Sequence, residues 1–325
     1  IMKKLLKVLA LGLALMLLLT FTGCGKSEPV NIRVGALKGA TTLGLLDMKT
    51  KAGDGTYTNS YEFSMATAAD EIAGKLIKGE LDIALIPANL ASVLYNKTEG
   101  KVGVIDINTL GVLYVVSRDP EVKEITDLKG KTVYLTGKGT TPDYVLRYIL
   151  SANGIEDEVT LEYKSEATEV ASVIEADETA VGLLPQPFAT ATCLTIEGAA
   201  EVLDMNEEWN RTRTDGAKLV TGVTVVRKDF LSDNPDAVKE FIEAHRASAE
   251  AAMNETEKIA PLAVEEGIIP KEPLALKAIP KCNIVCITGS EMKDALSGYL
   301  GVLYELDPTA VGGSLPGDDF YEDIK

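Results

Sequence analysis

The chain repeats part of its own sequence, and this repeat restricts the possible folds more than any other feature. Lys38-Gly39-Ala40-Thr41 matches Lys138-Gly139-Thr140-Thr141 at an offset of 100 residues (138 minus 38). A longer block, 68–92, matches 166–190 at an offset of 98 residues (166 minus 68). Two separate blocks with nearly equal offsets predict two lobes with the same βαβαβ order. The alternative is two unrelated α/β segments that share only generic helix and strand patterns.

Strands and helices alternate in both halves of the repeat, which predicts parallel sheets. The first half reads as strands at 31–37, 61–65 and 81–86, with helices from about 42 and over 69–76. The second half reads as strands at 131–135, 159–163 and 181–184, with helices from 141 to 152 and over 167–175. Thr141 is expected to cap the first of these helices. A further strand at 218–227 and a long helix at 235–254 precede a mostly helical C-terminal part, which we expect to pack on the first lobe.

Length and composition agree with two lobes. The chain has 325 residues, of which 46% are hydrophobic, so it can bury a large core. Its formal net charge is -17, and such a surface repels nucleic acid.

The N-terminal residues resemble the signal peptide of a bacterial lipoprotein. Lysines 3, 4 and 7 precede an apolar run at 8–21, which suits a signal peptide better than a membrane span. Phe21-Thr22-Gly23-Cys24 resembles a lipobox, with Phe21 where leucine is usual. We therefore expect a signal peptide at 1–23, lipidation of Cys24 and a polar tether at 24–30. The alternative is a plain secretory signal with a chance cysteine.

Four loops follow predicted strands and carry the residues expected to bind a ligand. Glycine lets backbone N–H groups approach a ligand closely, and threonine hydroxyls both donate and accept hydrogen bonds. In open α/β sheets, ligands bind beyond the carboxyl ends of the strands. The loops do not fit a Walker phosphate loop, because the required glycine spacing is absent. For any one loop, an ordinary helix cap is the alternative. The residues concerned are Lys38, Gly39, Thr41, Thr42, Pro87, Ala88, Asn89, Gly137, Gly139, Thr140, Thr141, Gln186 and Phe188.

The amides of Asn89 and Gln186 suit a neutral or mixed donor–acceptor ligand. Phe188 either stacks on a planar group or belongs to the core. Lys38 and Lys138 either pair with an anion or are solvated, and we expect at least one to be solvated. Trp209 either lines the cleft or shields the junction of the lobes.

Catalytic and metal sites are not expected. His245 is the single histidine and lies on the apolar stripe of the helix at 235–254, which favours a packed position. The local spacing of histidine and cysteine matches no metal motif. Cys282 and Cys286 are expected on one face of a strand, where residues four apart lie about 13 Å apart and so cannot form a disulfide. We also expect no cofactor.

GELDIALIPANLAS, TGKGTTPDYVLRYIL and LLPQPFATAT resemble the substrate-binding lipoproteins of ABC importers, in the branch that binds sulfonates, taurine, nitrate and pyrimidine precursors. This resemblance covers nearly the whole mature chain. It implies a type II periplasmic-binding-protein fold: two α/β lobes, each with a mostly parallel sheet flanked by helices, joined by two crossover strands near 115–118 and 219–223. Lobe I would comprise 31–116 and 222–325, and lobe II 117–221. Gly222 and Thr224 would then lie beside the cleft, and Gln186-Pro187-Phe188 makes nitrate an unsuitable cargo.

The resemblance implies a monomer, lipid-anchored to the outer face of the bacterial cytoplasmic membrane. It would capture a small organic ligand between its lobes and deliver it to an ABC permease and ATPase. The alternatives are a cytosolic-type enzyme of the same fold, making pyrimidine or menaquinone precursors, and a ligand-sensing receptor lipoprotein.

Overall fold

The computed structural model describes residues 28–324. The predicted signal peptide and Cys24 lie outside this range, as does most of the predicted tether. None of the described helices combines the length and the hydrophobicity that crossing a bilayer requires.

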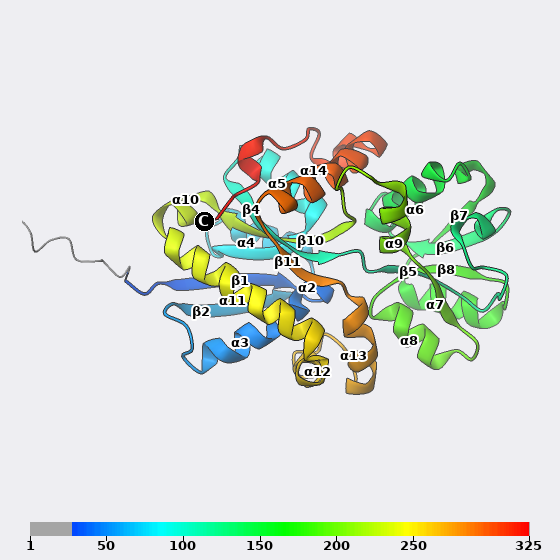
Figure 1. Cartoon of the computed structure of the whole chain (residues 1–325), viewed down its shortest axis with the longest axis horizontal. Helices are drawn as coiled ribbons and strands as arrows, with labels where there is room; N and C mark the ends of the chain where they lie inside the picture. The colour runs from blue at the N-terminus through cyan, green and yellow to red at the C-terminus, as the bar shows by residue number, and fades with distance from the viewer. Residues whose placement is uncertain (1–27, 325) are drawn as a thin grey trace, which may run out of the picture. The chain divides into compact units, whose positions relative to one another are not determined.

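The first sheet has six strands in the order β11-β4-β10-β3-β1-β2 (Figure 1). Strand β1 is parallel to both β2 and β3, whereas β10 is antiparallel to β3 and β4. The parallel arrangement predicted from the repeat therefore holds for β1, β2 and β3. The remaining strands pair in antiparallel fashion, so the sheet is mixed. Its strands are β1 (Asn31–Leu37), β2 (Ser60–Ala66), β3 (Ile83–Pro87), β4 (Val102–Leu110), β10 (Val220–Arg227) and β11 (Ile284–Ile287).

The second sheet has the order β7-β6-β8-β5-β9 and the same wiring as the first. Strand β6 is parallel to β7 and β8, and β5 is antiparallel to β8. Each sheet thus joins three parallel strands to an antiparallel strand that pairs with the third of them, as expected for two lobes with the same strand order. Its strands are β5 (Leu113–Ser117), β6 (Thr132–Thr136), β7 (Thr160–Lys164), β8 (Val181–Pro185) and β9 (Ala200–Asp204).

Helices flank both sheets (Figure 1). The long helix α11 spans the predicted residues and packs against β11 and α3. The apolar stripe of α6 is buried as predicted, but its N-cap is Thr140 rather than Thr141, and no side chain caps it. With the first sheet lie α2 (Ala40–Leu43), α3 (Leu46–Gly53), α4 (Ala69–Ile77), α5 (Ala88–Lys97), α10 (Lys228–Asp233), α11 (Pro235–Asn254), α12 (Thr256–Glu265), α13 (Glu272–Ala278) and α14 (Gly289–Leu306); with the second lie α6 (Thr141–Ala152), α7 (Ala167–Ala176), α8 (Phe188–Thr195) and α9 (Met205–Thr212).

The chain crosses between the sheets a few residues earlier than expected. It leaves β4 at Leu110 and enters β5 at Leu113, and it returns between the end of α9 and Val220. The expected crossover at 115–118 lies largely within β5, because that strand pairs with β8 and β9 along its length. An added Cβ at Gly111 would lie 2.7 Å from Leu219 Cδ2, so the two crossings pack closely against each other.

The C-terminal part returns to the first lobe, as predicted. Strand β11 forms the edge of the first sheet and pairs with β4, and α14 contacts α5 and β4. Trp209 is fully buried between Tyr148 of α6 and Tyr299 of α14, so it shields the junction of the lobes.

Candidate functional site

Gly222 brings together three of the predicted segments in lobe I. It pairs with Pro87 across β10 and β3. A Cβ at this position would lie 2.5 Å from Asn108 Oδ1 and 2.5 Å from Thr41 Cγ2, so a side chain would force its neighbours apart. The loop after β1, the loop after β3 and the crossover strand therefore meet here.

The threonines of the first Lys-Gly loop are fastened to the end of β1. The Thr41 and Thr42 hydroxyls both donate to the carbonyl oxygen of Leu37, at 3.0 and 2.6 Å, and both side chains are buried. Only their remaining acceptor capacity is left for a ligand. Lys38 is exposed, and its Nζ lies 3.0 Å from where a Cβ of Gly267 would stand.

The segment after β3 begins helix α5. Pro87 is the N-cap residue and Ala88 is buried. Asn89 is half-buried, and its Nδ2 donates to the carbonyl oxygen of Ala310 at 3.5 Å, a long hydrogen bond that is easily exchanged.

The second Lys-Gly loop is held in a turn by hydrogen bonds, one of them to the carboxylate of Asp143 in the helix that follows. Gly137 and Gly139 have φ values of 77 and 70, in the left-handed region that favours glycine. The backbone N–H and the hydroxyl of Thr140 both donate to Gly137 O. The N–H of Gly139 donates to Asp143 Oδ2 at 2.8 Å, so an acidic side chain already stands at the start of α6.

Asp143 is buried and held by two further groups. Arg147 Nε and the Tyr163 hydroxyl both donate to its Oδ1 at 2.7 Å. Lys138 is exposed but lies over the Tyr163 ring at 5.3 Å, and Thr141 hydrogen-bonds to the Tyr299 hydroxyl of lobe I. The polar groups of this loop are thus largely engaged with protein partners.

Gln186 is likewise engaged within lobe II. It is buried, its Nε2 donates to Glu201 Oε1 at 2.9 Å, and the Thr190 hydroxyl donates to its Oε1 at 2.8 Å. Phe188 begins α8 and is 46% exposed, so its ring is available for stacking rather than buried in the core.

Polar contacts that the sequence did not predict join the lobes. Glu201 of lobe II pairs with Lys281, and the Tyr114 hydroxyl donates to the Lys281 carbonyl oxygen at 2.9 Å. The Tyr144 hydroxyl of α6 donates to Asp307 Oδ2 at 2.8 Å. These residues lie far apart in sequence and share no local pattern, so no sequence signal could have found them.

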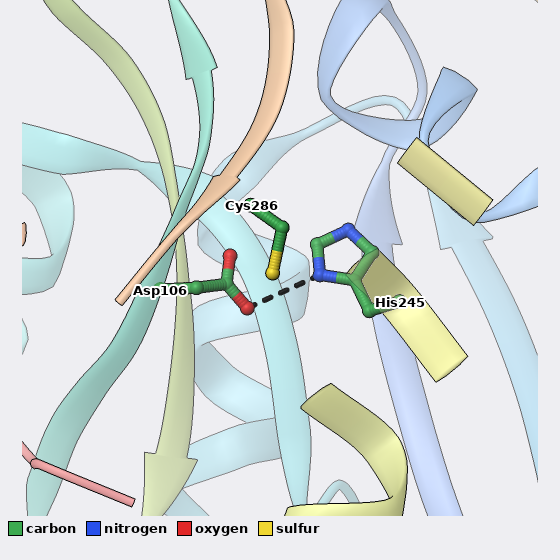
Figure 2. A group of neighbouring side chains, drawn as sticks. All are labelled: Asp106, His245 and Cys286. Carbon is green, nitrogen blue, oxygen red and sulfur yellow. Dashed lines mark hydrogen bonds and ion pairs between the residues drawn. The ribbon is translucent and has the colours of Figure 1, made fainter. Parts of the chain in front are cut away.

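A buried polar cluster of Asp106, His245 and Cys286 lies where β4, α11 and β11 meet (Figure 2). His245 Nδ1 is 3.1 Å from Asp106 Oδ2, and Cys286 Sγ lies beside both. The Thr224 hydroxyl donates to Asp106 Oδ1 at 2.8 Å and accepts from Asn108 Nδ2 at 3.2 Å. His245 is packed, as predicted. Burial, with the charge of Asp106 next, raises the pKa of the Cys286 thiol well above its ordinary value, so the thiol is protonated near neutral pH.

This cluster corrects two expectations. Sequence spacing indicated no grouping of histidine and cysteine with metal ligands, but the fold brings together residues from β4, α11 and β11. Cys282 was expected on one strand with Cys286, yet β11 begins at Ile284 and Cys282 precedes it. Cys282 and Cys286 form no disulfide, as expected, although Cys282 is not on the strand that the spacing argument assumed; Cys193 is a free thiol as well.

A cavity of about 670 Å³ lies elsewhere on lobe I. It is lined near the start of β4 and the end of β10, including Val102 and Arg227. The predicted ligand loops follow the carboxyl ends of β1 and β3, whereas the cavity lies toward the opposite ends of these strands. The cavity therefore does not mark the predicted site.

Comparisons with known proteins found one matching family model and several solved structures of similar fold. A family model described as "Menaquinone biosynthesis" matches residues 56–279. An ABC transporter structure from Parabacteroides distasonis is 26% identical, covers 92% of this chain and 100% of its own, and has a TM-score of 0.76. The periplasmic aliphatic sulphonate-binding protein from Escherichia coli is 13% identical over 92% and 94% of the two chains, with a TM-score of 0.72. The alkanesulfonate-binding protein from Xanthomonas axonopodis pv. citri, bound to MOPS, is 13% identical over 90% and 96%, with a TM-score of 0.62. No curated protein sequence matches the chain.

Proposed function

The chain belongs to the family described as menaquinone biosynthesis, and from the binding-protein fold that it shares with ABC-transporter components we propose that it is an extracytoplasmic solute-binding lipoprotein. It captures a small organic molecule between its lobes and delivers it to an ABC permease and ATPase. It acts as a monomer, held by a lipid on Cys24 at the outer face of the cytoplasmic membrane.

The observation that carries this proposal is the full-length likeness to the Parabacteroides distasonis ABC transporter structure, which reaches 26% identity and covers that chain completely. The internal geometry supports it. Two sheets of the same wiring are joined by two crossings that pack together at Gly111. Adjacent crossings of this kind let two rigid lobes rotate about one hinge, so that a ligand touching both lobes favours the closed state.

The residues proposed to contact the ligand fall into two unlike groups. Lobe I contributes Gly39, Thr41 and Asn89 around Gly222, and Lys38 supplies an exposed positive charge. Lobe II contributes the backbone of 137–141 and the exposed ring of Phe188. Asp143 and Glu201 lie under the lobe II loops and disfavour an anionic group there. We infer a small polar ligand whose acidic group, where it has one, faces lobe I and whose planar part faces Phe188.

An enzymatic function is the second candidate, and the family model favours it. That model is described by a biosynthetic pathway and matches residues 56–279, which span most of both lobes. An enzyme making a menaquinone precursor would consume its ligand, whereas a binding protein releases it unchanged. Cys24 also distinguishes the two, because a cytosolic enzyme carries no lipid.

A thermal-shift screen with sulfonates, pyrimidines, amino acids and aromatic carboxylic acids tests the proposal. A true ligand at about a hundred times its Kd adds roughly 2.7 kcal/mol to the free energy of unfolding. Each ligand that shifts the melting temperature is then recovered and analysed by mass spectrometry. Unchanged ligand supports the binding protein, and conversion with turnover supports the enzyme. Labelling the expressing bacterium with a radioactive fatty acid checks the anchor, and a mature protein without label at Cys24 contradicts the lipoprotein.

A further inference from the structure

Three different metal-ligating side chains meet in the core of lobe I. Asp106 comes from β4, His245 from α11 and Cys286 from β11 (Figure 2). One carboxylate oxygen, one ring nitrogen and the sulfur all lie within 4.8 Å of one another. Ligand atoms around a single Zn²⁺ stand about 3 to 4 Å apart. Shifts of about 1 Å in the side chains would therefore close the site around one ion.

Packing alone does not account for this cluster. Asp106 and His245 are fully buried, and burying polar groups destabilises a fold unless every group has a partner. The His245 ring turns its Nδ1 toward Asp106 and Cys286, so this nitrogen, one carboxylate oxygen and the sulfur face one another in the core (Figure 2). The Cys286 sulfur reaches only the Ile242 carbonyl oxygen, at 4.0 Å. Three apolar side chains would fill the same volume without these costs, so the polar set requires another explanation.

We propose that Asp106, His245 and Cys286 form a binding site for one divalent transition-metal ion, with Zn²⁺ the best match to the donors. Zinc binds carboxylate oxygen, imidazole nitrogen and thiolate sulfur, and sites of mixed donors commonly leave a fourth position for water. The thiol proton leaves to solvent when the sulfur binds the ion. Two anionic ligands then balance the charge of the ion, so the loaded site is neutral in the core.

The surroundings provide a second ligand shell and a route of entry. The Thr224 hydroxyl orients Asp106 through its other oxygen, and Asn108 in turn orients Thr224. A cavity of about 300 Å³ opens beside the cluster and is lined by Cys286, Arg246 and Glu250. Glu250 is exposed at this opening and offers a carboxylate to an entering cation. The bound ion would fix α11 and β11 to β4, a strand inside the first sheet. This site is independent of the ligand proposed for the cleft.

Cobalt titration of the purified full chain tests the proposal, because Co²⁺ occupies zinc sites and its thiolate complexes absorb in the near ultraviolet. We expect a saturable thiolate-to-cobalt band that corresponds to one ion per chain and disappears when Zn²⁺ is added. C286S removes the sulfur with little change in shape and is expected to abolish the band. C193S and C282S change the other two described thiols and serve as matched controls that keep the band.

Two results would overturn the site: no thiolate band at millimolar Co²⁺, or a band that persists in C286S. Circular dichroism confirms that each variant is folded. Should C286S fail to fold, T224V offers a milder change, since loss of the hydroxyl that orients Asp106 is expected to weaken Co²⁺ binding by about 10- to 100-fold. T224S keeps the hydroxyl and is expected to bind as the unchanged protein does. Equal affinity in T224V and T224S would contradict the role given to this second shell.

Discussion

The two Lys-Gly loops share one sequence pattern, yet they use their polar groups differently. After β1, Thr41 and Thr42 donate back to Leu37, the helix that follows has four residues, and the loop packs against Gly222. After β6, the loop folds into a glycine turn that Asp143 closes, and the following helix has twelve residues. The repeat therefore preserves the order of strands but not the chemistry of the loops. If the ligand lies between these two loops as proposed, we expect it to bind in one orientation.

The crossover strands show the same contrast. Gly222 of β10 pairs with Pro87, and Leu113 of β5 pairs with Pro185, so the two residues hold equivalent positions in the two lobes. Lobe II fills this position with a buried leucine, and lobe I leaves it without a side chain. The close approach of Thr41 and Asn108 to the backbone at this position is therefore a property of lobe I alone.

Giving lobe I the side chain of lobe II is expected to have the largest effect. In G222L the new Cβ would lie 2.5 Å from Asn108 Oδ1 and Thr41 Cγ2, so both must move. We expect the free energy of unfolding to fall by about 3 kcal/mol, as for overpacked cores, and ligand binding to be lost. Urea unfolding measures the first effect and the thermal shift with ligand the second. In the control G74A, the added methyl meets open space on α4, and stability should stay equal or rise slightly. Full ligand affinity in G222L would remove Gly222 from the site.

Removing the charge that closes the second loop is expected to have the next largest effect. D143N weakens the hydrogen bonds from Gly139 and Tyr163 and leaves Arg147 without its nearest anion. Because hydrogen bonds to a charged group contribute about 1.5–3 kcal/mol, we expect a loss of about 2 kcal/mol in urea unfolding. The variant should also bind anionic ligands relatively better than the unchanged protein. D70N alters an exposed acid in the first turn of α4 and should change stability by less than about 0.5 kcal/mol. An unchanged ligand preference in D143N would mean that this loop does not face the ligand.

The sequence predicted the fold more accurately than it predicted the contacts of the site residues. Hydrophobic periodicity and Pro235 predicted the bounds of β1 and α11 correctly, because these signals are local and each element buries its apolar residues. The sequence repeat predicted that the two lobes share one order of strands. Site residues were harder, because a hydroxyl such as Thr42 satisfies a nearby carbonyl as readily as a ligand. Glu201, Lys281 and the Asp106–His245–Cys286 cluster depend on contacts between distant segments, which no local spacing encodes.

Substituting the two amides predicted to contact the ligand, Gln186 and Asn89, should show which of them stabilises the fold and which binds the ligand. Q186A leaves Glu201 and Thr190 without their amide partner in a buried position, so we expect a loss of about 1–2 kcal/mol in urea unfolding. N89A removes only a 3.5 Å hydrogen bond and should change stability by less than about 0.5 kcal/mol. Isothermal titration then compares affinities. A drop in N89A reports a direct contact with the ligand. If N89A instead unfolds as readily as Q186A, the amide of Asn89 is structural.

The smallest expected effect concerns the contact that joins the second loop's helix to lobe I. Hydroxyl groups of Thr309 and Tyr144 and the N–H of Thr309 donate to Asp307 and hold its pKa below the ordinary value. The folded protein therefore binds this proton less readily than the unfolded chain. The resulting stabilisation is present above the ordinary aspartate pKa of about 3.9 and is lost as pH falls through the lower folded value. In Y144F one donor is missing, so melting temperature should fall less steeply with acidity than in the unchanged protein. Y304F changes an exposed tyrosine on α14 and should leave the acid profile unaltered. Parallel acid profiles in Y144F and the unchanged protein would show that the Tyr144 hydroxyl does not lower the pKa of Asp307.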